Sequence, residues 1–261
     1  MEQNIVYEIG ASFVKAVDIL LNIVSTLLIL CVFGYSLFCL IDNNMTYQKA
    51  SSHNYQTYKP LNSESLSFID YAKGNGDIAG WLTLDNTGVD YPLVHGNDQF
   101  YLDHDASRNT ALTGSLFLTR HNNPDFSDFN SIIYGHHMEK GQMFGDLDKY
   151  LEKDFFENNK SGKIFYDSER KNDENYNENG AWAWHELEIV AVAECKADDK
   201  AWYTPGLTSD EAKADYLDLI RSKSKFVRQD ALEMGARYLE MSTCKADETN
   251  GRTVVIAKIL D

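Results

Sequence analysis

The sequence predicts a mainly β protein: an eight-stranded β-barrel with inserted helices, preceded by one N-terminal transmembrane helix. Apolar runs rich in β-branched and aromatic residues, several of them alternating with polar residues, recur between residues 79 and 260 and are typical of strands. Many short strands joined by short spacers favour a closed or nearly closed barrel. The expected strands are 79–84, 89–94, 114–119, 131–134, 162–166, 186–194, 237–243 and 253–260.

Two segments inside this pattern have helical periodicity. In 144–156, apolar residues recur at spacings of three and four, which predicts an amphipathic helix. These residues are Phe144, Leu147, Leu151 and Phe155. In 209–222, Ala212, Tyr216, Leu219 and Ile220 form one apolar stripe, and the preceding Thr208 stands with Glu211 in capping-box positions. We therefore expect a second helix there.

The N-terminal region contains a candidate membrane anchor. Residues 19–41 carry no charge, and about 20 such residues span a bilayer as a helix. The run is longer than the apolar part of a signal peptide, about 7–15 residues, and no small-x-small cleavage site follows it. We expect an N-terminal tail over 1–15, an anchor over 16–41, a polar stalk that can carry short helices over 42–75, and one globular domain over 76–261.

Composition excludes some functions. The net charge of −16 argues against a nucleic-acid partner, because phosphate neutralisation requires clustered Lys and Arg. The acidic stretch 167–179 is typical of a solvated loop or hairpin tip. Cys31 and Cys39 lie in the apolar run, which leaves Cys195 and Cys244 for the globular domain. Two cysteines do not make a disulfide scaffold, and a bridge between them would remove the thiol chemistry proposed next.

A cysteine and an arginine stand at the facing ends of the last two expected strands. If these strands pair antiparallel, Cys244 and Arg252 face each other with Cα atoms roughly 5 Å apart. A guanidinium keeps its charge, and its planar donors suit a carbonyl oxygen that gains negative charge beside an attacking sulfur. The pair predicts acyl transfer through a thioester.

This chemistry also needs a proton carrier. Residues 131–134 read as a short buried strand that Gly135 ends, and His136 and His137 follow at its mouth. An imidazole can both accept and donate a proton, so either histidine is a candidate general acid and base.

Taken together, these motifs resemble the sortases, and most closely the class B sortases of Gram-positive bacteria. The resemblance covers about residues 76–261. It is carried by Tyr-Gly-His-His-Met at 134–138 with Met143-Phe144 after it, by Ser-Thr-Cys at 242–244, and by Arg252 eight residues later. Gly80-Trp81-Leu82 and Tyr91-Pro92-Leu93-Val94 add to it. A helix between the sixth and seventh strands, within 196–236, is also a class B feature.

The resemblance implies a role for each of three residues. Cys244 would be the nucleophile, His136 the general acid and base, and Arg252 the group that stabilises the oxyanion or orients the substrate. His136 is preferred to His137 because the family's catalytic histidine directly follows the glycine. Some class B members carry an acid two positions after the cysteine, where this chain has Ala246, so the resemblance assigns no role to Asp247.

The resemblance further implies a membrane-anchored cysteine transpeptidase with an extracellular catalytic domain and no cofactor or metal. Its substrates would be surface proteins with a C-terminal sorting signal of NPxTx type, cleaved after Thr. The acyl group would pass to the amine of a cell-wall precursor of lipid II type. The alternative within the class is a pilus polymerase, whose accepting amine is a lysine of another pilin subunit.

Three other classes of protein explain fewer of these sequence features. A papain-like peptidase places its cysteine before its histidine, the reverse of the order here. A zinc hydrolase using His121, His136, His137 and Cys244 lacks HExxH or CxxC spacing. A non-catalytic surface-anchored binding domain explains the anchor, but it gives no reason for the placement of Cys244 and Arg252. Trp182, Trp184 and Trp202 could line a peptide groove, although core packing is the simpler expectation for each.

Overall fold

The computed structural model describes residues 2–61, 66–170, 180–245 and 248–260. The chain divides into two compact units, Met1–Gln48 and Lys49–Asp261, which are treated separately below. The expected acidic loop falls largely on 171–179, and Asp247 also lies outside the described residues.

The first unit consists of most of helix α1 (Glu2–Ala50). Apolar side chains from Phe13 to Ile41 are exposed along it. Its most apolar stretch has a mean hydropathy of 2.4, and by length and composition the helix is able to cross a membrane. The uncharged run 19–41, which the sequence predicted as part of an anchor, lies within this helix.

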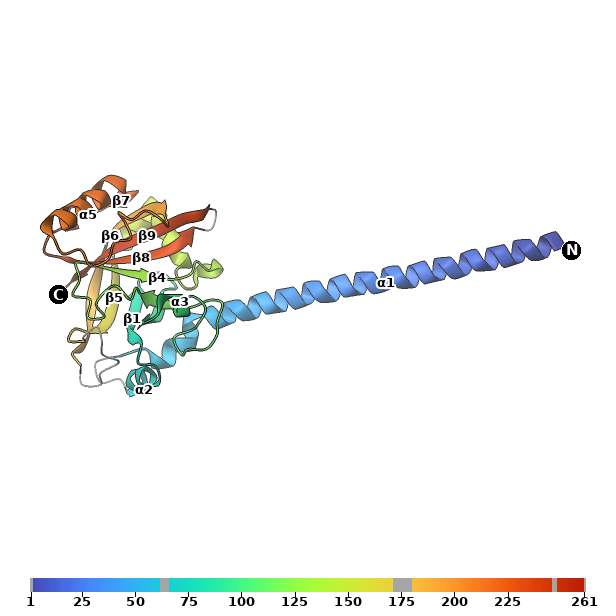
Figure 1. Ribbon diagram of the computed structural model, residues 1–261, viewed down its shortest axis with the longest axis horizontal. Coiled ribbons are helices and arrows are strands. Elements are labelled where there is room, and N and C mark those ends of the chain that lie inside the picture. The colour runs from blue at the N-terminus through green and yellow to red at the C-terminus, as the bar shows by residue number, and fades with distance from the viewer. Residues whose placement is uncertain (1, 62–65, 171–179, 246–247, 261) are drawn as a thin grey trace. The chain divides into compact units, whose positions relative to one another are not determined.

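The second unit is built on a closed β-barrel (Figure 1). In the described residues the strands are β1 (Ile78–Leu84), β2 (Asp90–His95), β3 (Leu116–Leu118), β4 (Asn130–Tyr134), β5 (Ser161–Asp167), β6 (Trp182–Lys196), β7 (Phe226–Val227), β8 (Arg237–Lys245) and β9 (Glu248–Leu260). They are hydrogen-bonded in the order β5-β1-β2-β3-β4-β8-β9-β6-β7. The first half of β6 also pairs with β5, which closes eight strands into a barrel and leaves β7 attached outside the ring.

The predicted eight-stranded barrel is therefore confirmed, with changes at the ends of strands. β6 begins at Trp182, earlier than expected, because its first residues pair with β5. β8 and β9 both continue beyond Cys244 and Arg252 into the connection that was expected to be a loop. The two-residue β7 was not predicted, since it is too short to carry a periodic pattern.

Alternation along the strands separates two buried layers. Leu239, Met241 and Val255 point into the barrel and belong to its main apolar core. Val254 and Ile256 point outward and are covered by helix α5 (Asp210–Lys223), which lies beside β6 and β7 in Figure 1. The last strands are thus buried on both faces, which explains their nearly continuous apolar sequence.

The two predicted helices differ from expectation in detail. The segment expected as one helix over 144–156 is a 3₁₀ helix, η3 (Gly145–Leu151), followed by α4 (Lys153–Asn158). The break falls at Glu152, whose backbone is extended, so that the chain turns and both pieces can pack on the barrel. The second helix is confirmed as α5, but its N-cap is Ser209, whose hydroxyl accepts from the Ala212 N–H at 3.2 Å.

Shorter helices cover the remaining surface: η1 (Ser52–Tyr58), α2 (Leu66–Gly74), α3 (Asp98–Tyr101), η2 (Glu139–Gly141) and η4 (Gln229–Ala231). Phe68 and Ala72 of α2 are buried beside Trp182. Trp202 is buried beneath α5, and Trp184 packs at the edge of the cluster that contains Trp182. These three tryptophans therefore pack in or against the core, which agrees with the simpler expectation.

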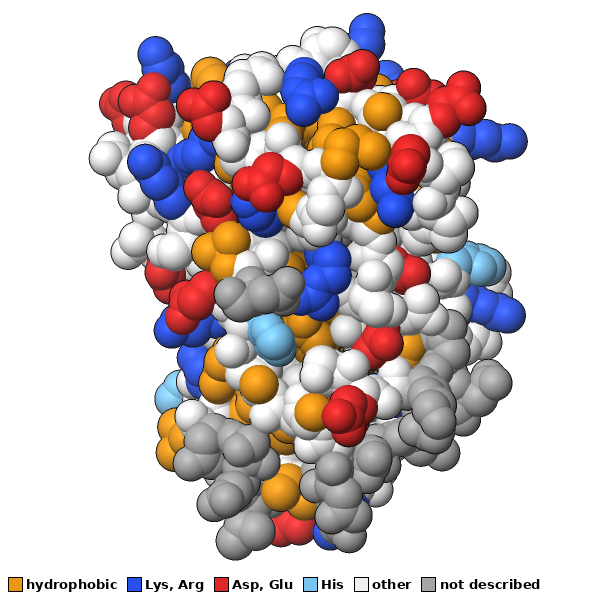
Figure 2. Space-filling model, turned by 90° about the vertical axis from the view of Figure 1, so that its left-hand side faces the viewer, with side chains coloured by type: hydrophobic (Ala, Val, Ile, Leu, Met, Phe, Trp, Pro, Cys, Tyr) orange, Lys and Arg blue, Asp and Glu red, His pale blue; other side chains and the backbone are white. Residues whose placement is uncertain are grey.

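Both signs of charge occur on the surface of the second unit. In the face shown in Figure 2, Lys and Arg side chains are interspersed with Asp and Glu side chains. Some of the charged side chains of this unit form pairs, such as Lys163 with Glu186 at 2.7 Å. Exposed pairs of this kind contribute little to stability, typically about 0–1 kcal/mol each.

A buried acid lies between the barrel and α5. Glu240 of β8 is fully buried, and its Oε2 accepts a hydrogen bond from the Tyr216 hydroxyl at 2.9 Å. No hydrogen-bond partner among the described residues reaches Oε1. Burial raises the pKa of Glu240 from 4.5 to about 8, so the carboxyl group is protonated at neutral pH.

This raised pKa makes the fold less stable as pH increases. Between pH 4.5 and about 8 the unfolded chain has released the proton and the folded chain has kept it, so the free energy of unfolding falls with rising pH. The slope from this group is at most about 1.4 kcal/mol per pH unit. We expect Glu240→Gln to remove it, as measured by urea unfolding of the full chain in detergent with tryptophan fluorescence. The exposed Glu186→Gln should keep the wild-type slope, and an unchanged slope in Glu240→Gln would contradict the assignment.

Candidate active site

One pocket of about 380 Å³ contains all three residues that the sequence singled out. It lies where β4, β8 and β9 meet α3 and the segment after β3. Its lining comprises Asp98, Gln99, Leu102, Phe117, Thr119, His121, Tyr134, Gly135, His136, Ser242, Thr243, Cys244 and Arg252. Apolar walls with a few convergent polar groups are typical of a binding site for an extended ligand.

Strand register aligns the thiol with the guanidinium. β8 and β9 are antiparallel, and Cys244 lies directly opposite Arg252. Directly opposed residues project to the same face of a sheet. The expected facing pair is therefore present, and Cys244 is exposed to solvent at the pocket.

The parallel pairing of β4 with β8 places the histidine segment at the same end of the barrel as Cys244. Tyr134, the last residue of β4, lies opposite Ser242 of β8. The Gly135 N–H then donates to the Ser242 carbonyl at 3.2 Å. Because parallel strands advance together, His136 and Cys244 each stand two residues beyond this pair, at the same end of the barrel.

Gly135 is required by packing. A Cβ atom at this position would lie 2.3 Å from Leu116 Cδ2 and 2.7 Å from Phe144 Cδ2, both side chains of the core. Any larger residue would push the following turn, and with it His136, away from the barrel. The glycine that ends the strand therefore also sets the position of the imidazole.

The His136 ring has a defined hydrogen-bond partner. Its Nε2 lies 2.8 Å from the Leu102 carbonyl oxygen, just beyond α3. A carbonyl only accepts, so Nε2 carries the proton and Nδ1 keeps its lone pair when the ring is neutral. This arrangement leaves one ring nitrogen available as a base.

His137 points elsewhere and is not among the residues that line the pocket. Its Nε2 lies 2.8 Å from Asp148 Oδ2. Asp148 Oδ1 in turn accepts from the Thr253 hydroxyl at 2.6 Å. The two adjacent histidines therefore have different surroundings, one in the pocket and one against η3.

The Arg252 guanidinium uses few of its hydrogen-bond donors within the described part of the chain. Its Nη1 donates to the Gly251 carbonyl at 2.8 Å, and within the described part of the chain no carboxylate forms an ion pair with it. A guanidinium has five N–H donors in a planar fork. The remaining donors can serve a carbonyl or carboxylate brought into the pocket.

The second thiol of this unit is kept apart from the first. Cys195 of β6 lies opposite Arg252 on the other side of β9, so one strand separates it from Cys244. Two strand spacings amount to roughly 9–10 Å, beyond the Cα separation that a disulfide spans. Both cysteines are free, and burial raises the pKa of the Cys195 thiol to about 11.

A hydrogen-bonded chain that the sequence did not reveal supports this edge of the pocket. The Tyr203 hydroxyl lies 3.3 Å from Cys195 Sγ and 2.9 Å from Ser242 Oγ. The Tyr203 ring stacks on Tyr134, with centroids 6.1 Å apart. Alternation along β8 places Ser242 on the same face as Cys244, but only tertiary contacts identify its partner.

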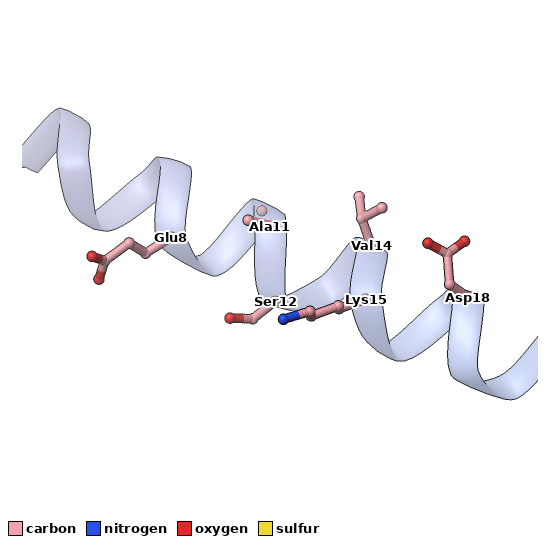
Figure 3. A pocket seen from close by; sticks show the side chains of 7 residues that line it. Glu8, Ala11, Ser12, Val14, Lys15 and Asp18 are labelled. Atoms are coloured by element: carbon pink, nitrogen blue, oxygen red, sulfur yellow. The ribbon is translucent and has the colours of Figure 1, made fainter.

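In the described ranges no cluster of metal ligands accompanies the pocket. No group of three or more His, Cys, Asp or Glu side chains there is arranged to hold a metal ion. Side chains of Glu8, Ala11, Ser12, Val14, Lys15 and Asp18 border another hollow, shown in Figure 3. They all project from one helix, α1, so a single element forms that surface and no catalytic groups converge on it.

The accessibility of the two thiols gives a direct test. We expect iodoacetamide to modify Cys244 at least about tenfold faster than Cys195 in the folded full chain, because Cys195 is half-buried and its thiol is deprotonated only at high pH. Peptide mass mapping after timed quenching measures both sites in one sample. Comparable rates in the native protein, rather than only in urea, would contradict this geometry.

Comparison with known proteins gives consistent matches. The family profile described as "Sortase domain" matches residues 82–260. The curated Sortase B of Listeria monocytogenes is 35% identical over 196 residues, covering 73% of each chain. The Sortase B of Staphylococcus aureus is 28% identical and covers 95% of this chain and 97% of its own.

Solved structures agree with these sequence matches. The crystal structure of sortase B from the type II pilus of Streptococcus pneumoniae has a TM-score of 0.58 and 36% identity, with 72% of this chain and 95% of that chain covered. The Clostridium perfringens sortase B structure has a TM-score of 0.65 and 28% identity, with coverages of 74% and 100%.

Proposed function

The chain belongs to the sortase family, as a class B cysteine transpeptidase, and from this premise we propose that Cys244, His136 and Arg252 carry out the reaction. The observation that supports this assignment is the meeting of the three side chains in one pocket through two strand registers. Cys244 attacks a carbonyl of the substrate and forms a thioester. Arg252 donates hydrogen bonds to the oxyanion, which is the largest single contribution in many acyl transfers.

His136 moves the protons in both halves of the reaction. It accepts the thiol proton and delivers it to the departing amine, so that the peptide bond breaks as the thioester forms. It then takes a proton from the incoming amine, which attacks the thioester and releases the Cys244 thiolate. Amine capture replaces one acyl bond by another, and no metal or organic cofactor enters the scheme.

The substrate of this proposal is a surface protein with a C-terminal sorting signal, cleaved after Thr. The acceptor is the amine of a cell-wall precursor. The peptide would bind in the pocket at the ends of β4, β8 and β9, which has apolar walls at Leu102 and Phe117. We assign an NPxTx-type motif to the signal on family grounds.

The proposed location is the outer face of a cell membrane. Residues 16–41 of α1 would be the anchor, with 1–15 on the cytoplasmic side. Residues 42–75 would connect it to the catalytic domain over 76–261. From Lys49 onward this connection belongs to the same compact unit as the barrel.

A pilus polymerase of class B is the second candidate. It is favoured by the 36% identity to a sortase B from a pneumococcal pilus. The two functions differ in the accepting amine, which is a pilin lysine in the polymerase. Mass spectrometry of the product formed with a glycine peptide or with a lysine-containing peptide as acceptor separates them.

Nucleophile and acid–base roles are tested by substitution. We expect Cys244→Ala to abolish thioester formation, and His136→Ala to lower transfer by about 10²–10⁴-fold, because the proton carrier is lost. Cleavage of a fluorogenic NPxTx-type peptide by the full chain in detergent measures both. His137→Ala should be milder, since that ring does not line the pocket. Transpeptidation by Cys244→Ala would instead favour a non-catalytic binding domain, and a larger loss in His137→Ala would reassign the acid and base.

The oxyanion role is tested by a substitution that keeps the charge. Arg252→Lys preserves one positive charge and loses the planar fork, and we expect turnover to fall by about 10²-fold. Steady-state kinetics with the same peptide measure it. Arg120→Lys, an exposed arginine outside the pocket lining, serves as the matched control. Near-normal turnover in Arg252→Lys would refute the proposed role.

A further inference from the structure

Asp148 of η3 joins two segments that lie far apart in the sequence. Its Oδ2 contacts His137 Nε2 at 2.8 Å, and its Oδ1 accepts from the Thr253 hydroxyl at 2.6 Å. His137 directly follows His136, and Thr253 directly follows Arg252. One carboxylate therefore connects the neighbours of two of the three proposed catalytic residues.

Both partners of Asp148 are more buried than Asp148 itself. Thr253 is fully buried and the side chain of His137 is 16% exposed, whereas the side chain of Asp148 is 34% exposed. η3 itself is anchored by Leu147 and Tyr150, which are both fully buried in the main core. A carboxylate carried by such a rigid element is able to fix the groups that bind to it.

The neighbouring charged residues of η3, Asp146 and Lys149, bind other groups and do not compete for the Asp148 carboxylate. Lys149, the adjacent base, pairs with Asp146 at 2.8 Å. Asp146 also accepts from the Gly88 N–H and so holds a different loop. The two acids of η3 thus have separate partners.

Strand alternation explains how a contact inside the barrel can act on the pocket. Thr253 lies opposite Thr243, while Arg252 lies opposite Cys244. Successive residues project to opposite faces, so Asp148 holds β9 from within at the position next to Arg252. On the histidine side, the Phe144 N–H donates to the His136 carbonyl at 3.0 Å, and His137 pairs with Met143. The turn that carries His136 is thereby tied to the segment leading into η3.

We propose that Asp148 is a positioning residue: by binding His137 and Thr253 together, it holds the His136 imidazole and the Arg252 guanidinium in register around Cys244. The inference rests on the proposed function, because it assumes that these three groups react. A misplacement of about 1 Å in such a site costs up to about 10²-fold in rate. Asp148 touches none of the reacting atoms in this scheme and acts through its two partners.

The test uses the full chain in detergent, a fluorogenic NPxTx-type peptide and a glycine peptide as acceptor. We expect Asp148→Asn to lower kcat about tenfold while KM changes less than about twofold, because peptide binding persists and alignment is lost. Thr253→Val, which removes the hydroxyl and keeps the shape, should reproduce the effect, and Thr253→Ser should restore activity. Asp154→Asn, an exposed acid on α4, is the matched control and should keep wild-type kinetics.

A double variant provides the readout that a purely structural role would not give. If Asp148 and Thr253 act as one unit, Asp148→Asn combined with Thr253→Val should be no slower than either single variant. Thermal unfolding of each variant shows whether the fold is retained at the assay temperature. Wild-type kcat in Asp148→Asn, a loss confined to KM, or multiplying losses in the double variant would each overturn the inference.

The result that would refute the proposed function differs from the result that would refute the positioning role of Asp148. Transpeptidation that survives in Cys244→Ala would refute the catalytic assignment whatever Asp148 does. An inactive Cys244→Ala together with a fully active Asp148→Asn would refute the positioning role alone.

Discussion

The pairing of β8 with a parallel strand on one side and an antiparallel strand on the other is the constraint on which the site depends. His136 follows the end of the parallel neighbour, β4, and stands at the same level as Cys244. In the antiparallel neighbour, β9, Arg252 lies opposite the same cysteine. A shift of one residue in either register would turn a functional side chain to the wrong face. Burial of β8 on both faces opposes such shifts, since every inward or outward residue would lose its packing.

Main-chain groups and packed side chains complete the arrangement. The Leu102 carbonyl selects the His136 tautomer, and the core side chains behind Gly135 set how closely the histidine turn approaches the barrel. The pocket is thus formed by α3, by the residues that follow it and β3, and by the ends of β4, β8 and β9. The strands that carry Cys244 and Arg252 are anchored by residues buried in the core.

The features that could be predicted from the sequence are those with a local pattern. Periodicity located the eight barrel strands and α5, and the spacing of Cys244 and Arg252 implied their facing positions in a hairpin. The 3₁₀ character of η3 was missed because its apolar spacing is also that of an α-helix. The contacts of Asp148 with Thr253, of Tyr203 with Ser242 and of Leu102 with His136 join residues 34 to 105 positions apart, and no local pattern encodes contacts of that kind.

The position of Arg252 between two thiols has a consequence for oxidative damage. Because one strand lies between Cys195 and Cys244, Cys195 is too far away to trap an oxidised Cys244 as a cystine. Within the barrel domain, a sulfenic acid formed at Cys244 is therefore reduced by an external thiol or proceeds to irreversible acids. Recovery from peroxide then does not depend on Cys195.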